Sequence, residues 1–273
     1  SIDIVDEIST KIPLFVICNL LGIPKGDWQE LQKSTDLFLK IFLPDRLSRQ
    51  EMREVNSASQ YFIEYFTDLI QHNQKQPDSN LTSELIKGPL RDGSISIEQL
   101  IGLLRGLFTA GFETTAATIS ACFLGFAKQK DQFEQIKLNE DAIPGAVNEI
   151  LRWETPVQAM IRYACEDLQL ENFGVVGAGE ALLLLTGSSN HDPKRYQIPN
   201  RINILRDSAD HHSFGGGRHY CLGFYLAKLE IEAVLREMRT RFNEMNLECT
   251  EIKRKPNLQF RSIISLPMSL IAN

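Results

Sequence analysis

A glycine-rich stretch that ends in a cysteine carries the clearest chemical signal in this 273-residue chain. It runs from Phe214 to Gly223 and reads Phe-Gly-Gly-Gly-Arg-His-Tyr-Cys-Leu-Gly. Three successive glycines allow backbone conformations and close approaches that side chains forbid. The pattern predicts that a helix begins at Cys221, where unpaired N–H groups and the helix dipole favour a negative charge. A thiolate is stabilised at such a position, so Cys221 is a candidate ligand or nucleophile.

Other interpretations of this stretch stay open when only its residues are considered. A glycine-rich turn followed by a buried structural cysteine has about equal weight, because free cysteine is among the most buried residue types. A zinc site is a weaker alternative, because the spacing of its ligands matches no usual zinc pattern. A phosphate-binding loop is excluded in practice, because no Gly-Lys-Ser/Thr follows the glycines. The ligands of the zinc alternative are His211, His212, His219 and Cys221.

An acid and an alcohol interrupt a long apolar segment, 97–127, that is predicted to form a buried central helix. Glu113 and Thr114 follow the small residues Ala110 and Gly111. The Thr114 hydroxyl can donate to the Ala110 carbonyl, four residues earlier, and such bonds bend helices. The small residues then leave room beside the bend. When this motif is taken alone, an ordinary helix–helix contact at Gly111, with Glu113 on a hydrated face, is slightly favoured.

A further charged pair, Glu149 and Arg152, lies at an i, i+3 spacing on a helix predicted over 141–153. Both residues point away from the apolar face of that helix. From the residues alone, a solvated surface salt bridge is therefore the favoured interpretation. The apolar face comprises Ile143, Val147, Ile150 and Leu151.

Helical periodicity covers most of the chain and predicts a mainly α fold with a small β portion. Further helices are predicted over 2–21, 27–42, 49–72 and 221–242, and Ser96 is a plausible N-cap for the central helix. Short apolar pieces separated by glycines predict a few strands between residues 157 and 186, and β-like pieces recur around 258–270. The segment 187–220 has the composition of a loop.

The composition allows one or two domains and narrows the classes of partner. Apolar residues make up 43% of the chain, which is ample for a large core. The net charge of −6 argues against a nucleic-acid-binding protein, which needs a basic face. The five cysteines include no Cys-x-x-Cys pair, which indicates a reducing compartment rather than a disulfide framework. The apolar run 12–23 is too short to cross a bilayer, so no membrane span is expected in this chain.

Taken together, these motifs resemble those of the cytochrome P450 family, in the style of its soluble bacterial members. Phe214, Gly217, His219, Cys221 and Gly223 fall on the haem-ligand loop Phe-x-x-Gly-x-His-x-Cys-x-Gly. The resemblance implies haem b as the cofactor and Cys221 as the thiolate on its iron, a ligand that favours O–O cleavage. It also implies that His219 binds a haem propionate, that Phe214 shields the thiolate, and that the glycines let backbone N–H groups approach the sulfur.

The distal-helix motif of the same family, Ala/Gly-Gly-x-Asp/Glu-Thr, matches residues 110–114. The resemblance implies that Glu113 and Thr114 hold water and relay protons to bound dioxygen. Arg162 matches an arginine that binds a haem propionate. The stretch 189–193 is similar to the family's Ala-Asn-Arg-Asp-Pro, with His191 in place of the arginine.

Glu149 and Arg152 match the Glu-x-x-Arg motif of the family, and Arg206 is the candidate third member. The resemblance replaces the surface salt bridge by a structural lock on the segment before the cysteine loop. It also implies a single haem domain over residues 1–273, and it places Ser1 about a third of the way into a chain of family length. The expected fold is therefore a P450 fold that is incomplete at its N-terminal end.

The function implied by the resemblance is a haem-thiolate monooxygenase that inserts one oxygen atom of O2 into a small, partly apolar organic substrate. Electrons would come from a ferredoxin and ferredoxin reductase or a similar donor, in the cytoplasm. Arg218 and Lys228 either meet an acidic redox partner or are ordinary surface charges, with equal weight. The alternatives are a haem-thiolate peroxygenase or isomerase, or a non-catalytic fragment that does not hold haem. The expected substrate pocket comprises Leu107, Phe108, Ala110, Val157, Met160 and Ile263.

Overall fold

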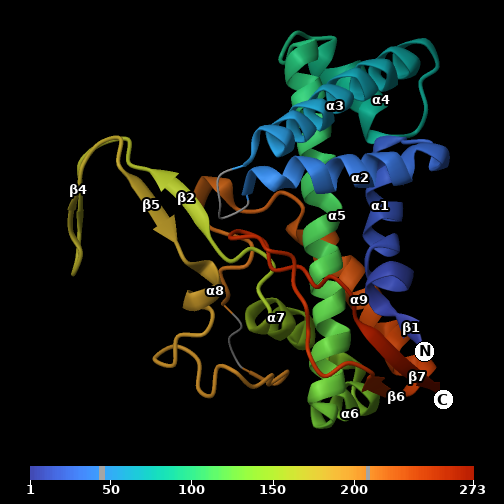
Figure 1. Cartoon of the computed structure of the whole chain (residues 1–273), viewed down its shortest axis with the longest axis vertical. Coiled ribbons are helices and arrows are strands. Elements are labelled where there is room, and N and C mark those ends of the chain that lie inside the picture. Colours follow the sequence, from blue (N-terminus) through green and yellow to red (C-terminus); the bar gives the residue numbers. More distant parts are fainter. Residues whose placement is uncertain (43–46, 207–209) are drawn as a thin grey trace.

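The structure is a computed structural model that describes residues 1–42, 47–206 and 210–273. Its longest helix, α5 (Ile97–Lys128), runs through the middle of the molecule, and the other elements gather around it (Figure 1). A capping box begins this helix: Gln99 N donates to Ser96 Oγ, and Ser96 N donates to Gln99 Oε1. Such reciprocal bonds satisfy donors that the first turn would leave unpaired. The predicted start of the central helix is confirmed, and its end lies one residue beyond the prediction.

Helices cover the two ends of α5 (Figure 1). The helices α1, α2 and α3 lie toward its N-terminal part, whereas α6, α7 and α9 lie around its C-terminal part. The bounds of the helices other than α5 are α1 (Lys11–Leu21), α2 (Trp28–Phe38), α3 (Arg49–Lys75), α4 (Leu81–Leu85), α6 (Lys130–Leu138), α7 (Ile143–Trp153), α8 (Thr186–Ser189) and α9 (Phe224–Arg241).

Single turns of 3-10 or π helix join several of these helices. They are η1 (Val5–Ser9), η2 (Lys25–Asp27), η3 (Leu39–Phe42), η4 (Ile86–Leu90), η5 (Glu140–Ala142) and η6 (Gly217–His219).

The strands form three small antiparallel sheets, in the orders β1-β7-β6, β2-β5 and β3-β4. The first sheet brings the two ends of the chain together, and the other two extend as an arm from the helical body (Figure 1). The strands are β1 (Ile2–Asp3), β2 (Met160–Tyr163), β3 (Leu168–Leu170), β4 (Gly174–Val176), β5 (Ala181–Leu184), β6 (Phe242–Leu247) and β7 (Pro267–Ala272).

The N-terminal segment differs from its prediction. A helix was expected from residue 2, but Ile2 and Asp3 pair with β7, and α1 begins only at Lys11. The backbone N–H of Leu266 donates to the Asp3 carboxylate, which fixes this end of the chain in the sheet. Helical periodicity cannot reveal a partner strand that lies more than 260 residues away in the sequence.

The helix expected over 27–42 consists of α2 followed by the 3-10 turn η3. Pro44, which was expected to follow the end of that helix, lies outside the described residues. The strand β6 was not predicted at all.

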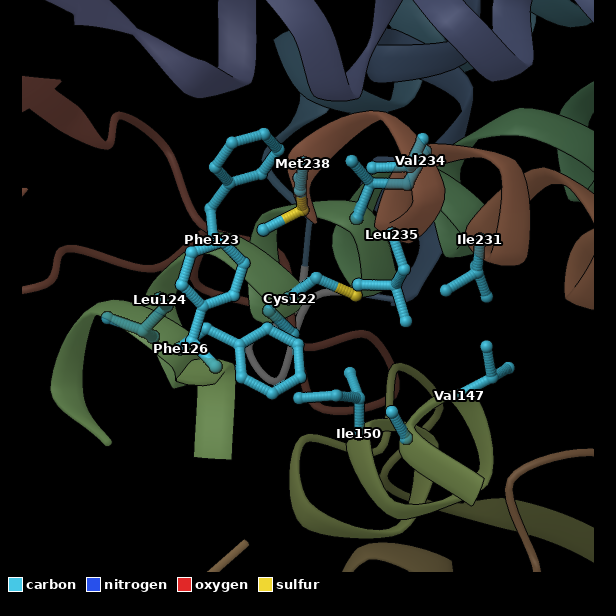
Figure 2. Packing of buried hydrophobic residues seen from close by; sticks show 14 of the residues in the cluster. Cys122, Phe123, Leu124, Phe126, Val147, Ile150, Ile231, Val234, Leu235 and Met238 are labelled. Atoms are coloured by element: carbon cyan, nitrogen blue, oxygen red, sulfur yellow. The ribbon is translucent and has the colours of Figure 1, made fainter. Parts of the chain in front are cut away.

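Two hydrophobic clusters make up the core, and α5 passes through both. In the cluster that contains Phe123 and Phe126, residues of α5 pack against side chains of α7 and α9 (Figure 2). By length and composition α5 could cross a membrane, but 67% of its most apolar stretch is buried inside the protein. Its all-round apolar surface is explained by burial in these clusters. The first cluster includes Leu14, Ile17, Leu31, Phe62, Phe66, Leu104, Phe108 and Phe112, and the second includes Cys122, Phe123, Phe126, Ile150, Ile231, Leu235 and Met238.

Candidate functional site

The cysteine loop, residues 214–223, folds back on itself before α9. The N–H of Cys221 donates to the Phe214 carbonyl at 2.9 Å, and the N–H of Tyr220 donates to the Gly217 carbonyl at 3.1 Å. Gly215 and Gly217 have φ angles of +73° and +62°, in the left-handed region that residues with a Cβ rarely adopt. Glycine is therefore required at these two positions for the loop to close.

The Cys221 side chain is exposed at the surface of the chain. The alternative of a buried structural cysteine is therefore wrong. Partial desolvation by the surrounding loop raises the pKa of the Cys221 thiol, and the N–H of Gly223 opposes this effect. The helix begins three residues later than predicted, at Phe224 with Gly223 as its N-cap. Cys221 thus lies just before the helix rather than on its first turn, which weakens the expected dipole effect.

The zinc alternative also fails. Among the described residues, no group of three or more His, Cys, Asp or Glu side chains is arranged to hold a metal ion. Ser213 N donates to the His211 ring, and burial, followed by the charge of Lys228, lowers the pKa of His211 to about 4. His211 therefore serves the packing of the loop in its neutral form.

An aromatic cluster surrounds the start of the cysteine loop. Phe214 is 9% exposed and contacts the rings of His211, Tyr220 and Phe224. The Lys228 ammonium lies 5.8 Å from the centroid of the Phe214 ring. These contacts hold the Phe214 ring in one place beside the loop that carries Cys221.

Glu149, Arg152 and Arg206 form one buried ion cluster. The Glu149 and Arg152 side chains are fully buried and share two hydrogen bonds, of 2.7 and 2.9 Å. Arg206 Nε donates to the same carboxylate at 3.2 Å. The residue-based expectation of a solvated surface pair is wrong, because the loop 190–206 folds over this face of α7.

The Arg152 guanidinium also donates to three backbone carbonyls, of Asn190, Pro199 and Arg201. All of its donors therefore have acceptors, which is the condition for burying a guanidinium without a large penalty.

A buried asparagine connects this ion cluster to the cysteine loop. Asn190 offers its carbonyl to Arg152, and its side chain accepts from His212 N at 2.8 Å and donates to Ser213 Oγ at 3.1 Å. Ser213 Oγ in turn donates to the Leu151 carbonyl of α7. The resemblance at 189–193 drew attention to position 191, but the His191 ring contacts the nearby Gly187 carbonyl. The residue that matters here is its neighbour Asn190.

The distal-helix motif divides between two faces of α5. Thr114 Oγ1 donates to the Ala110 carbonyl at 3.2 Å, as predicted from the spacing. Gly111 packs against α1: a Cβ at this position would lie 2.9 Å from Ile17 Cδ1. The room expected beside Gly111 is therefore filled by Ile17, and the helix–helix contact that the residues favoured is present. The α5 helix continues without interruption through the motif.

The Glu113 carboxylate does not meet the Thr114 hydroxyl. Glu113 Oε1 accepts hydrogen bonds from Lys255 Nζ and Ser262 Oγ, each at 3.0 Å. Lys255 also donates to Asp36 of α2 at 2.8 Å. These groups border a polar cleft of about 160 Å³ between η1, α2, α5 and the C-terminal segment.

The residues expected to line the substrate pocket do not all lie on the same face of α5. Phe108 is fully buried in the first core cluster beside Phe66 and Phe112, so its assignment to the substrate pocket is wrong. Successive residues of a helix are rotated by about 100° about its axis, and this rotation places Phe108 on the apolar face that packs against α3. Leu107 is half-buried and Ala110 is exposed on another face of α5.

The pocket residues outside α5 lie in two segments. Val157 is half-buried and pairs with Phe260 in an isolated bridge. Ile263 is 4% exposed and packs in the second core cluster, where it also borders the cleft at Glu113. Its assignment to the substrate pocket stays a prediction, and its neighbour Ile264 is the exposed residue of this pair.

Arg162 and Met160 lie beside the cysteine loop. A Cβ on Gly215 would lie 3.5 Å from the Met160 sulfur, and Arg162 Nη2 lies 3.9 Å from the same atom. No carboxylate of the described residues pairs with Arg162, whose other contact is the Ile161 carbonyl. His219 is exposed on η6 at the other end of the loop.

These residues fit a haem. An exposed thiol, two cationic or polar groups near the loop (Arg162 and His219), and exposed apolar side chains beside Cys221 match the chemistry of its iron, its propionates and its porphyrin ring. The exposed apolar side chains are Tyr220, Leu222 and Tyr225.

The sequence reasoning missed two contributors to this site, Asn190 and Lys255. Asn190 lies in a stretch that resembled a family motif, so a signal was present. Lys255 lies 142 residues from Glu113, and no local pattern pointed to it. Ser262 lies 149 residues from Glu113, in the stretch 262–264 that resembles a pocket-lining segment of the family.

The comparisons with known proteins identify the family and the fold of this chain. The family model of cytochrome P450 matches residues 27–271. The biotin biosynthesis cytochrome P450 of Bacillus subtilis is 32% identical over 268 residues, which cover 98% of this chain and 67% of that protein. The 6-deoxyerythronolide B hydroxylase of Saccharopolyspora erythraea is 30% identical, over 98% of this chain and 66% of that protein.

Among solved structures, P450BioI in complex with an acyl carrier protein ligated to hexadec-9Z-enoic acid has a TM-score of 0.92 and 30% identity. The match covers 98% of this chain and 69% of that chain. The chain thus spans about two thirds of the length of the curated relatives that it matches. The fold is that of a P450, and the family is haem-dependent, with haem b as its standard cofactor. The chain belongs to the cytochrome P450 family.

Proposed function

We propose that this chain supplies the haem-binding and oxygen-activating parts of a monooxygenase that inserts one oxygen atom of O2 into a small, partly apolar organic molecule. The observation that carries the proposal is the exposed Cys221 thiol on a loop held by its own backbone and by the Asn190 link to the buried ion cluster. A bound haem would supply the activation of dioxygen, with the Cys221 thiolate as the protein ligand. Arg162 and His219 would hold the haem propionates, and Phe214 would exclude water from the sulfur.

Glu113 and Thr114 of α5 would hold water and deliver protons. The Thr114 hydroxyl keeps Ala110 O occupied as an acceptor, and its oxygen lone pairs stay available to water. The Glu113 carboxylate is held by Lys255 and Ser262, and the polar cleft beside it offers an approach for water. The candidate substrate contacts are Leu107, Ala110, Val157, Met160 and Ile263.

The substrate class follows from the apolar character of those contacts. It agrees with the relatives, whose names refer to biotin biosynthesis and to 6-deoxyerythronolide B, and with the acyl-carrier complex of P450BioI. Electrons would come from a ferredoxin-type donor in the cytoplasm. No nucleic-acid partner is expected.

The reduced, CO-treated protein tests the haem ligand. We expect a Soret band at the position typical of thiolate-ligated haem, and we expect Cys221→Ser to abolish it. Cys165→Ser is the matched control, because Cys165 is also exposed and free. The absence of a haem band in the parent chain would support a non-catalytic fragment instead.

Oxygen consumption tests the distal alcohol. Thr114→Ala should lower the fraction of consumed O2 that appears in product by roughly tenfold or more, because a positioned proton donor is lost. Thr109→Ala is the control, since Thr109 makes the same kind of bond, to the Arg105 carbonyl, on the same helix. Unchanged coupling in Thr114→Ala would refute the proton-relay role. Turnover with hydrogen peroxide and no reductase would favour the peroxygenase alternative.

A further inference from the structure

The segment near the C-terminus doubles back over residues 253–264 as a short hairpin, which we call the C-terminal hairpin. Lys255 N donates to the Ser262 carbonyl, and Ile264 N donates to the Lys253 carbonyl, both at 2.9 Å. Arg254 and Ile263 form the bridge between these bonds. Successive residues of extended chain point to opposite faces. Arg254 therefore lies on one face of the hairpin, and Lys255 and Ser262 lie on the other.

A buried carboxylate meets the first face. Glu154 follows the last residue of α7 and is 7% exposed. Its Oε1 accepts from Arg261 Nε at 2.7 Å and lies 2.6 Å from an Arg254 guanidinium nitrogen. One acid thus holds two cations of the hairpin, and Arg254 keeps only 24% of its side chain exposed.

The Glu113 carboxylate meets the second face. Lys255 and Ser262 both donate to it, and both are adjacent in sequence to the two arginines that Glu154 holds. Burial alone would lower the pKa of the Lys255 ammonium, but the charges and hydrogen bonds of Glu113 and Asp36 outweigh it, so its pKa is raised. The hairpin therefore lies between two carboxylates, one from the end of α7 and one from the middle of α5.

Backbone bonds add a third connection. Gln158 N donates to the Gln259 carbonyl at 2.7 Å, and Arg261 N donates to the Pro156 carbonyl at 2.9 Å. The segment that carries the candidate substrate contact Val157 is thus hydrogen-bonded to the same hairpin, and we call it the wall segment. A shift of the hairpin therefore disturbs these two bonds as well as the donors of Glu113.

We propose that Glu154 is a positioning residue: through the C-terminal hairpin it fixes the Lys255 and Ser262 donors of Glu113 and the wall segment at Val157. This inference rests on the proposed function for its catalytic consequence. Its physical cause is electrostatic. Without the Glu154 carboxylate, the Arg254 and Arg261 guanidiniums on the same side of the hairpin lose their shared counter-charge. Arg254 is also largely buried, so its unpaired charge is costly. The hairpin then shifts to rehydrate them, and its opposite face moves away from Glu113.

Amide exchange in the 273-residue chain, which needs no haem, tests the mechanical part. Glu154→Gln should speed exchange at the amides of Gln158 and Arg261 by about tenfold or more, because these two amides bond across the boundary between the hairpin and the wall segment and lose their acceptors when the hairpin shifts. Glu154→Asp, which keeps the charge, should restore part of the protection. Glu171→Gln is the control, since Glu171 is exposed on the β3–β4 turn. Unchanged exchange in Glu154→Gln would overturn the proposal.

A double-mutant cycle in the haem-loaded enzyme tests the catalytic part. Glu154→Gln and Lys255→Gln should each lower the coupling of O2 consumption to product several-fold, and the double variant should lose less than the two single losses combined. Additive losses would show that Glu154 does not act through Lys255 and would overturn the proposal. The thiolate-type CO band should persist in Glu154→Gln.

Failure of the proposed function is distinguishable from failure of this inference. If the parent chain shows no thiolate-type band, the proposed function fails, and the exchange experiment still decides the role of Glu154. If Glu154→Gln does not fold, Arg261→Lys replaces it. That variant keeps the charge but loses the planar donor fork, so the same changes are expected at smaller size.

Discussion

At the scale of single residues, burial decides what a charged group does. Glu149 and Arg152 looked like a surface pair because their i, i+3 spacing and the apolar face beside them are typical of solvated helices. The loop 190–206 converts the pair into the fully buried centre of a network, where every guanidinium donor has an acceptor. Such a pair orients its surroundings because a misplaced partner would leave a buried charge unpaired.

Glu230 of α9 is also a buried carboxyl, but unlike Glu149 it lacks a full set of partners: no described group donates a hydrogen bond to its Oε2. Burial raises its pKa from 4.5 to about 7. Between these pH values the folded chain binds more protons than the unfolded chain, so the free energy of unfolding falls as pH rises. The loss from this group amounts to about 3 kcal/mol between pH 4.5 and 7.

We therefore expect Glu230→Gln to be more stable than the parent chain at pH 8 and to lose most of that advantage at pH 4.5. Urea unfolding at the two pH values measures the difference. Comparison at matched pH cancels other titrations, including that of His211. An equal difference at both pH values would contradict the raised pKa.

At the scale of elements, α7 is the platform for the site. It carries the buried ion pair, it accepts the Ser213 bond that holds the cysteine loop, and Glu154 at its end holds the C-terminal hairpin. Its position depends on a close approach at Gly145, where a Cβ would lie 2.5 Å from the Ile204 carbonyl oxygen. Only glycine allows α7 to approach the loop backbone so closely.

Gly145→Ala should therefore destabilise the chain by about 1–3 kcal/mol, because a backbone carbonyl cannot move aside as a side chain can. Gly102→Ala is the matched control: it also lies inside a helix, but a Cβ there meets nothing within 4 Å. That substitution should stabilise α5 by about 0.5–1 kcal/mol. Urea unfolding checks both, and a neutral Gly145→Ala would show that the loop yields.

At the scale of the whole molecule, α5 joins the two core clusters. Phe108 and Phe112 pack in the first cluster, and Phe123 and Phe126 pack in the second. A continuous helix cannot lose one cluster without exposing large aromatic surface on the same rod. We expect the chain to unfold as one cooperative unit, as a single domain would.

The two tryptophans report the clusters separately, because Trp28 packs against the first and Trp153 against the second. In Trp153→Phe and Trp28→Phe, the remaining indole should show fluorescence transitions at the same urea midpoint as circular dichroism of the same variant. Separate midpoints within one variant would mean that the chain contains two folding units.

The sequence by itself determined the class of the fold, most helices, and the positions of the thiol, the distal alcohol and the Glu-x-x-Arg pair. These depend on local periods, caps and motifs, which a linear sequence carries. It could not determine which face of α5 meets which neighbour, so Phe108 was assigned to a pocket and lies in the core. Only the tertiary structure brought Lys255, Ser262 and Asn190 to the site, and it placed two acids, Glu113 and Glu154, on opposite faces of one hairpin. The physical reason is that burial and ion pairing depend on contacts between segments far apart in the chain, and those contacts leave no trace in local spacing.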